Sequence, residues 1–169
     1  MIFVPFTGID NHKKSVTFGA ALLGNETADL YIWLLKCFLS AFGKQPKIVV
    51  TDQDAALAKA VKAVFTESIH RLCMWHIGKK LTDKVCPNII FGTDFRQRLQ
   101  NLVWNPCIDY DVFEEKWIRL IEEFNLGENK WLKEMFRIRD RWIPVFFKGV
   151  NLSGLMRTTS LSESQKNFF

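Results

Sequence analysis

The sequence lacks any long hydrophobic run. Its richest apolar segment, residues 30–42, is interrupted by Lys36 and followed by Lys44, whereas a membrane-spanning helix needs about 18 or more consecutive apolar residues. Residues 1–6 contain no basic segment and no small-residue cleavage site, so a secretory signal peptide is not indicated. We therefore expect a soluble protein with no membrane partner, whose chain begins inside a strand.

The sequence also has no run of five or six like charges and few cysteines. Its 23 Lys and Arg residues against 18 Asp and Glu residues give a formal net charge of +5. Such an excess is compatible with a nucleic-acid partner but is weak evidence for one, because many ordinary domains are as basic. The irregular spacing of the four cysteines indicates reduced, mostly buried thiols rather than a disulfide framework. They are Cys37, Cys73, Cys86 and Cys107.

Apolar residues, by contrast, are abundant. They make up 48% of the 169 residues and include 15 Phe and 6 Trp, which excludes a disordered tail. The length fits one domain, which would bury about 70% of the surface of the unfolded chain. Most of the tryptophans recur at helical spacing and are interpreted as core residues rather than as a base-stacking surface. These are Trp33, Trp104, Trp117, Trp131 and Trp142.

The first half of the chain alternates strand-like and helix-like segments. Residues 2–7 and 16–23 are rich in β-branched and aromatic residues and predict an antiparallel pair. Residues 30–42 repeat apolar side chains every three to four positions and predict a helix, with Asn25 or Thr27 to cap its start and Gly43 to end it.

The next segments predict two further strands followed by helices. Residues 47–51 form a short apolar run typical of a buried central strand, and residues 68–75 predict another strand. Between them, Asp54 can cap a helix that buries Leu57, Val61, Val64 and Phe65. After about residue 78, apolar stripes indicate three helices, at residues 95–103, 113–124 and 131–136. Because no linker separates the halves, we expect one domain over residues 1–169. It would have an α/β core (about 1–78), a helical insertion (about 79–150) and a return to the core (151–169).

Asp52 is the first candidate for chemistry. It follows the strand at residues 47–51, and a carboxylate at the carboxyl end of a strand, beside Thr51 and Asp54, is placed to hold a divalent cation. Alternatively, Asp52 or Asp54 caps the helix that follows, and both interpretations can hold because there are two acids.

The second candidate is the pair Cys73 and His76. A thiolate and an imidazole could supply half of a tetrahedral zinc site, but no second pair has matching spacing. The remaining groups of this kind are His12, His70, Cys86 and Cys107. We therefore favour a buried cysteine and a hydrogen-bonded histidine. His76 would lie close to Asp52 if the strands at residues 47–51 and 68–75 are neighbours. Glu163 has no distinguishing local feature and, on composition alone, is interpreted as a surface residue.

Several segments together resemble a known family. They are residues 4–12, 18–23, 31–34, 51–56, 70–77, 162–164 and 167–169. In this order they look like the Mutator-like element (MULE) transposase domain, in the version found in plant proteins related to FAR-RED IMPAIRED RESPONSE and FAR-RED ELONGATED HYPOCOTYL.

The resemblance implies an α/β fold with an RNase H-like mixed sheet and a helical insertion. It also implies an ancestral catalytic triad of Asp, Asp and Glu that holds two Mg²⁺ or Mn²⁺ ions for phosphodiester cleavage. Asp52 falls on the second acid and Glu163 on the third, and these two would be the metal ligands. Cys73 and His76 fall on the family's Cys-x-x-His element near the catalytic centre.

One departure from the family pattern determines the expected function. The first acid of the family lies on a strand that precedes the first strand of this sequence, and Asp10 is a poor substitute because it falls in the hairpin turn. We therefore expect a sheet without its first strand and no catalysis by this chain alone.

The resemblance further implies a nuclear regulator of DNA-templated transcription, with DNA as a partner and homo- or heterodimers with related regulators. Zinc is expected only in family domains that this sequence does not contain. Two alternatives remain: a fragment of an active Mutator-type transposase, and a scaffold that dimerises through its helical insertion.

Overall fold

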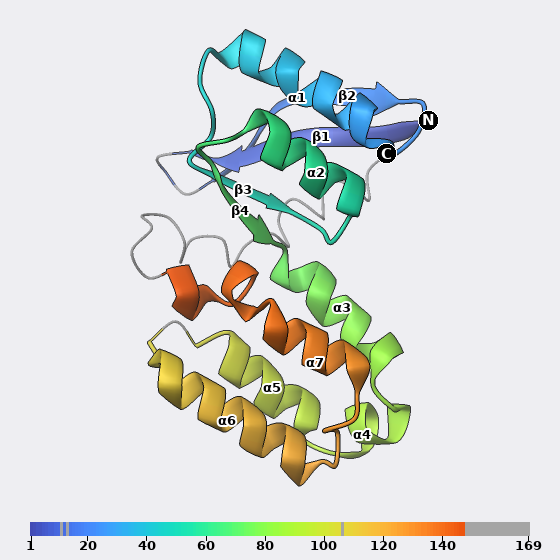
Figure 1. The fold of residues 1–169 in the computed structure, drawn as a ribbon, viewed down its shortest axis with the longest axis vertical. Coiled ribbons are helices and arrows are strands. Elements are labelled where there is room, and N and C mark those ends of the chain that lie inside the picture. The colour runs from blue at the N-terminus through green and yellow to red at the C-terminus, as the bar shows by residue number, and fades with distance from the viewer. Residues whose placement is uncertain (11, 13, 106, 148–169) are drawn as a thin grey trace. The chain divides into compact units, whose positions relative to one another are not determined.

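The chain forms two compact units. The computed structural model describes residues 1–147 apart from 11, 13 and 106, and the division between the units falls between Cys73 and Met74 (Figure 1). This division lies a little before the position at which the apolar pattern of the sequence changes. Among the described residues, the first unit contains both strands and helices, and the strands all lie in that unit. The fold is therefore mixed α/β, as predicted.

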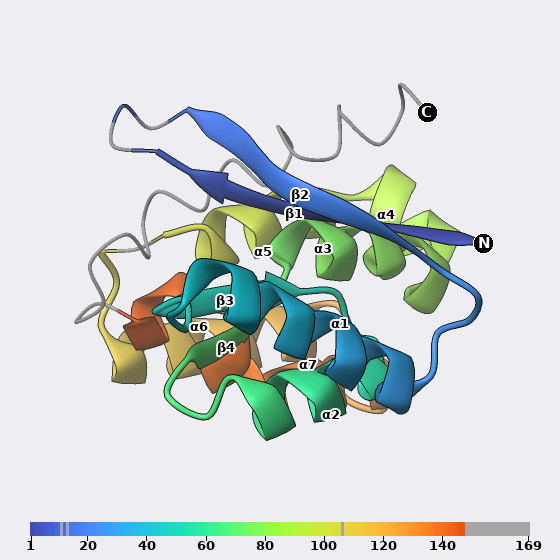
Figure 2. The same ribbon diagram turned by 90° about the horizontal axis from the view of Figure 1, so that it is seen from above.

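The first unit opens with an antiparallel hairpin. Strands β1 (Ile2–Ile9) and β2 (Ser15–Leu23) pair along their whole lengths, which confirms the predicted pair, and Figure 2 shows them side by side. The register shifts between Phe6 and Thr7. Near this irregularity a Cβ atom on Gly8 would lie 2.3 Å from Cε2 of Phe18, so the close approach of the Phe18 ring favours glycine at position 8.

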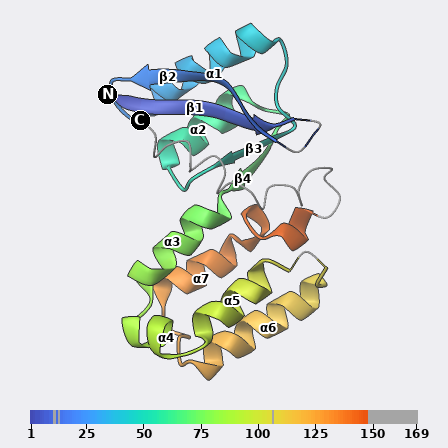
Figure 3. The same ribbon diagram turned by 180° about the vertical axis from the view of Figure 1, so that it is seen from behind.

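Two helices follow the hairpin and pack against each other. Helix α1 (Ala28–Phe42) begins after Thr27 and ends at Gly43, whose φ of 68° is left-handed, as predicted. Thr27 holds the N-cap position, but its hydroxyl donates to Oδ1 of Asn25 and makes no capping hydrogen bond. Helix α2 (Ala55–Val64) begins after Asp54 and buries Ala60, Val61 and Val64. Both helices lie on the same face of the strands, in front of them in Figure 1 and behind them in the opposite view of Figure 3.

The second pair of strands is parallel and separate from the hairpin. Strands β3 (Ile48–Thr51) and β4 (Ile69–Leu72) pair with Val49 opposite His70. The strand predicted at residues 47–51 is confirmed as β3. Among the described residues it pairs with β4 alone and its residues are half-buried, so its central position stays a prediction. One hydrophobic core nevertheless contains residues of the hairpin, of β3 and of both helices.

The second unit consists of helices. They are α3 (Met74–Lys84), α4 (Pro87–Gly92), α5 (Phe95–Val103), α6 (Tyr110–Glu123) and α7 (Lys130–Arg137), followed by the 3₁₀ turns η1 (Arg139–Arg141) and η2 (Pro144–Phe147). The three predicted helices are confirmed as α5, α6 and α7. The strand predicted at residues 68–75 is wrong beyond Leu72. Met74 begins a helix because Ile77 and Leu81, one turn apart, are its buried residues.

Aromatic rings form much of the core of the second unit. Phe95 and Phe113 are fully buried, and the ring of Trp117 contacts those of Phe113, Phe136 and Trp142 at centroid distances of 5.7–6.3 Å. The interpretation of the tryptophans as core residues is therefore right for Trp117 and Trp142. It is wrong for Trp33 on α1, which is 56% exposed. Within the described part of the chain, no helix has the length and apolar character needed to cross a membrane.

Candidate functional site

Asp52 lies where the sequence predicts it, directly after the last residue of β3. Its side chain is exposed, and its Oδ1 atom accepts a hydrogen bond from the backbone N–H of Asp54 at 3.1 Å. The carboxylate thus orders the turn between β3 and α2 on an exposed side chain. This geometry permits a ligand but does not require one.

Asp54 has a structural role that explains its presence. It is the N-cap residue of α2, and its Oδ1 accepts a hydrogen bond from the backbone N–H of Leu57 at 2.6 Å. A carboxylate at this position satisfies one of the free N–H groups of the first helical turn and opposes the helix dipole favourably. The capping interpretation is therefore confirmed for Asp54.

Thr51 and His70 are neighbours of Asp52. The hydroxyl of Thr51 lies 2.8 Å from Nε2 of His70 and donates to the backbone carbonyl of Asp52 at 2.8 Å. His70 comes from the adjacent strand β4, two residues before Leu72, the register partner of Thr51. In the sequence analysis, His70 is considered as a candidate site residue only among the groups that could complete a zinc site. Its place beside Thr51 follows from the parallel register, which the residue spacing did not give.

The charges of three carboxylates act on the buried Tyr31. The pKa of Tyr31 on α1 is raised to about 12, first by burial of its hydroxyl and then by the charges of Glu26, Asp54 and Asp52. On the same unit, burial lowers the pKa of Arg71 to about 10.

The described residues by themselves do not fit a two-metal centre. Asp52 offers an exposed carboxylate, Asp54 is engaged in capping, and no three His, Cys, Asp or Glu side chains gather closely enough to hold a metal ion in the part of the chain that the structure describes. Glu163, the expected third acid, lies outside the described residues. Its role, and that of Asp52 as a metal ligand, stay predictions.

Cys73 and His76 lie on opposite sides of the division between the units. Cys73 follows β4, is 5% exposed, and donates its backbone N–H to the carbonyl of Thr51. His76 is on α3, with its ring edge-to-face against that of Trp75 at 4.9 Å. The sequence predicts that His76 lies close to Asp52 if the two short strands are neighbours. Strands β3 and β4 are neighbours, and the closeness of His76 to Asp52 itself stays a prediction.

The cysteines differ from expectation in one respect. All four are free thiols, as predicted, but only Cys73 is buried. Cys37, Cys86 and Cys107 are exposed, because Cys37 lies on the solvent side of α1 and the other two lie at helix ends or in loops.

Asp10 is in the hairpin turn, as the sequence indicates. Its Oδ1 accepts hydrogen bonds from the backbone N–H groups of His12 and Lys14, both at 2.8 Å. These bonds close the loop between β1 and β2, so Asp10 has a local structural function.

Comparison with known proteins agrees with the resemblance seen in the sequence. Residues 1–80 match the sequence profile of the MULE transposase domain. Over 90% of its length the chain is 35% identical to Protein FAR1-RELATED SEQUENCE 2 of Arabidopsis thaliana, and over 94% it is 32% identical to Protein FAR1-RELATED SEQUENCE 4. Over 97% it is 30% identical to Protein FAR-RED IMPAIRED RESPONSE 1 of the same plant.

The chain spans about a fifth of the length of each of these relatives, from 19% to 22%. The matches therefore concern one part of longer proteins. By these matches, residues 1–80 are similar to the MULE transposase domain, and the chain is similar to one part of the FAR1 group of plant proteins.

Proposed function

We propose that this chain is a transposase-derived domain of a plant nuclear regulator of transcription, and that it does not cleave DNA by itself. The observation that carries the proposal is the similarity to FAR1-related proteins over most of the chain, together with the MULE match over residues 1–80. The second acid, Asp52, is retained on an accessible sheet end, while Asp54 serves to begin α2. This arrangement agrees with an ancestral catalytic site whose acids now serve structure and intermolecular contacts.

We include in the proposal an RNase H-like sheet. The two strand pairs share one core and are covered on the same face by α1 and α2. A further strand placed between β1 and β3 would join the two pairs into one mixed sheet, and it would hydrogen-bond to the edges of β1 and β3 that pair with no other strand in residues 1–147. A form of the protein extended at its N-terminus by one strand and its connection should melt at a higher temperature. An unchanged melting temperature contradicts this part of the proposal.

The catalytic part is tested with supercoiled plasmid DNA. The chain is incubated with the plasmid in Mg²⁺ or Mn²⁺ buffer, and nicked and linear products are separated on agarose. We expect no cleavage above the background of an Asp52→Ala variant. Reproducible nicking that this substitution abolishes favours the alternative function, a fragment of an active Mutator-type transposase.

The regulatory part needs a readout in plant cells. The chain is fused to a DNA-binding domain of known specificity and expressed in protoplasts with a matching reporter gene. A change in reporter output, compared with the DNA-binding domain alone, supports a role in transcription. Fluorescent fusions show whether the chain accumulates in the nucleus, and reporter output that stays unchanged with nuclear protein present contradicts the proposal.

A further inference from the structure

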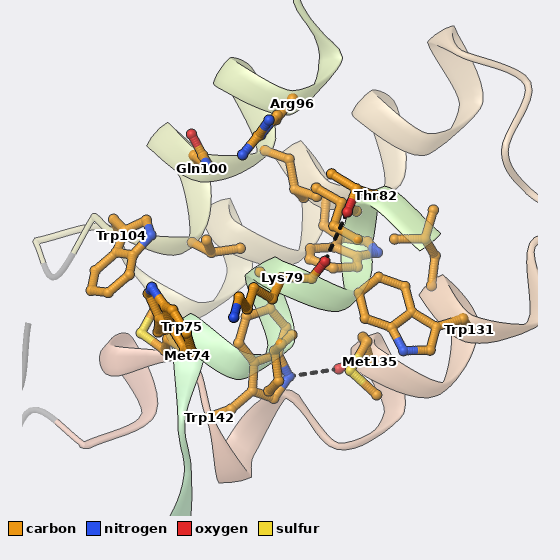
Figure 4. Close-up of a pocket in the computed structure, with 17 residues that line it drawn as sticks. Met74, Trp75, Lys79, Thr82, Arg96, Gln100, Trp104, Trp131, Met135 and Trp142 are labelled. Carbon is orange, nitrogen blue, oxygen red and sulfur yellow. Dashed lines mark hydrogen bonds between the residues drawn. The ribbon is translucent and has the colours of Figure 1, made fainter. Parts of the chain in front are cut away.

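The helical unit contains a cavity unrelated to Asp52 and its neighbours. Its volume is about 310 Å³, and residues of α3, α5, α6 and α7 together with Trp142 line it. Figure 4 shows Trp104 and Trp75 toward one end and Trp131 toward the other, with Arg96 and Gln100 of α5 along one side. A cavity of this size is at the lower limit of the range of small-molecule sites, about 300–1,000 Å³.

Indole rings give the cavity an aromatic lining. Five of its lining residues are tryptophans: Trp75, Trp104, Trp117, Trp131 and Trp142. Trp117 and Trp142 are buried, and the Trp142 ring is fixed because its Nε1–H donates to the carbonyl of Met135 at 2.9 Å. Fixed indole faces favour flat, apolar ligands that can pack against them.

Gly78 keeps the wall of the cavity open. It lies inside α3 and lines the cavity, and a Cβ atom added to it meets no heavy atom within 4 Å. Glycine inside a helix costs roughly 0.5–1 kcal/mol relative to alanine. Position 78 therefore faces open space although a larger residue would favour the helix.

The charges at the cavity are all positive. Lys79 and Arg96 are the charged residues among those that line it, and no carboxylate is among them. Nζ of Lys79 lies 4.2 Å from the centre of the Trp75 ring. Within the described part of the chain Arg96 forms no ion pair, whereas Arg98 on the same helix binds Glu123 through both carboxylate oxygens at 2.6 Å.

We propose that this cavity binds a small planar aromatic carboxylate. The ring would pack among the indoles, and the carboxylate would pair with Arg96 and Lys79 at the exposed side, where a guanidinium or an ammonium can donate charge-assisted hydrogen bonds. A cationic ligand of the same shape would be repelled. This inference is independent of the proposed role in transcription.

Naphthalene-2-carboxylate is the probe. It is titrated into the full chain by isothermal calorimetry beside two analogues with the same ring system, the neutral naphthalene-2-carboxamide and the cationic 2-naphthylmethylammonium. We expect saturable binding in the order carboxylate, amide, ammonium. Equal affinity for the carboxylate and the amide, or no saturable binding of the carboxylate, overturns the proposal.

Charge variants locate the site. Arg96→Gln and Lys79→Gln should each weaken binding of the carboxylate by about 2- to 5-fold, the range of an exposed ion pair, and leave the amide unchanged. Arg119→Gln on α6 is the matched control, because Arg119 is 75% exposed and does not line the cavity. An equal loss in all three variants overturns the proposal.

A blocking variant tests the cavity itself. Gly78→Leu should fill the open space and abolish binding, while Gly78→Ala should retain part of it and melt no lower than the original chain. Undiminished binding by a folded Gly78→Leu variant excludes this cavity as the site. If a single-stranded oligothymidylate displaces the carboxylate and binds more tightly, the occupant is a nucleic-acid base and the proposal is wrong.

Discussion

Replacing Asp54 by alanine removes the side chain that begins α2, and its effect separates a capping role from a ligand role. The Oδ1 atom of Asp54 accepts the Leu57 N–H at 2.6 Å. Loss of an N-cap carboxylate costs about 1 kcal/mol, within a range of about 0.5–2 kcal/mol. For a unit of this size, 1 kcal/mol corresponds to a decrease in melting temperature of about 4–8 °C.

The matched variants make the prediction specific. Asn caps a helix as well as Asp does, so Asp54→Asn should be nearly as stable as the original chain. Asp52→Ala should cost less than Asp54→Ala, because Asp52 is exposed and its bond to the Asp54 N–H is longer, at 3.1 Å. Urea unfolding followed by far-ultraviolet circular dichroism gives the free energy of unfolding of each variant.

The opposite order would refute the capping role. Two carboxylates held together as metal ligands repel each other when the metal is absent, so removing either one would stabilise the metal-free protein. If Asp54→Ala raises the free energy of unfolding, or if Asp54→Asn is as destabilised as Asp54→Ala, the side chain does not act as the cap of α2.

Three further predictions follow from the packing and the charges. Phe113→Ala should cost about 3–5 kcal/mol in urea unfolding because Phe113 is fully buried, whereas Ile118→Ala on the same helix, 48% exposed, should cost under about 1 kcal/mol. Gly43→Ala should lower the free energy of unfolding by about 1 kcal/mol, because the φ of 68° at the end of α1 disfavours a Cβ atom; an unchanged value would contradict this. In a Tyr110→Phe variant, Tyr31 is the one remaining tyrosine, and absorbance titration should show it ionising near pH 12. This pKa exceeds the unfolded value of about 10. The contribution of Tyr31 to stability is therefore complete below pH 10 and is lost as the pH rises toward 12. Ionisation near pH 10 in the folded protein would contradict the burial of its hydroxyl.

Periodicity predicts most of the elements because each one buries a regular set of side chains. The hairpin and the helices α1, α5, α6 and α7 all lie where the apolar pattern places them. The segment after Leu72 misleads because Cys73, Met74 and Trp75 form a continuous apolar run, and a short run of this kind does not distinguish a strand from the first turn of a helix. The spacing of the buried residues Ile77 and Leu81 further along the chain is what identifies this segment as a helix.

The site is harder to predict than the elements because an acidic residue at this position can either cap the next helix or bind a metal ion. A helix that follows a parallel strand begins with unpaired N–H groups, and an acid at that point satisfies them. A carboxylate there is also what a metal site at the carboxyl end of a strand requires. The sequence shows Asp52 and Asp54 in this place, and both interpretations predict them equally well. The hydrogen bonds assign the cap to Asp54 and leave Asp52 exposed. Asp52→Ala, rather than Asp54→Ala, is therefore the substitution that tests ligand chemistry at this end of β3, because it leaves the cap of α2 in place.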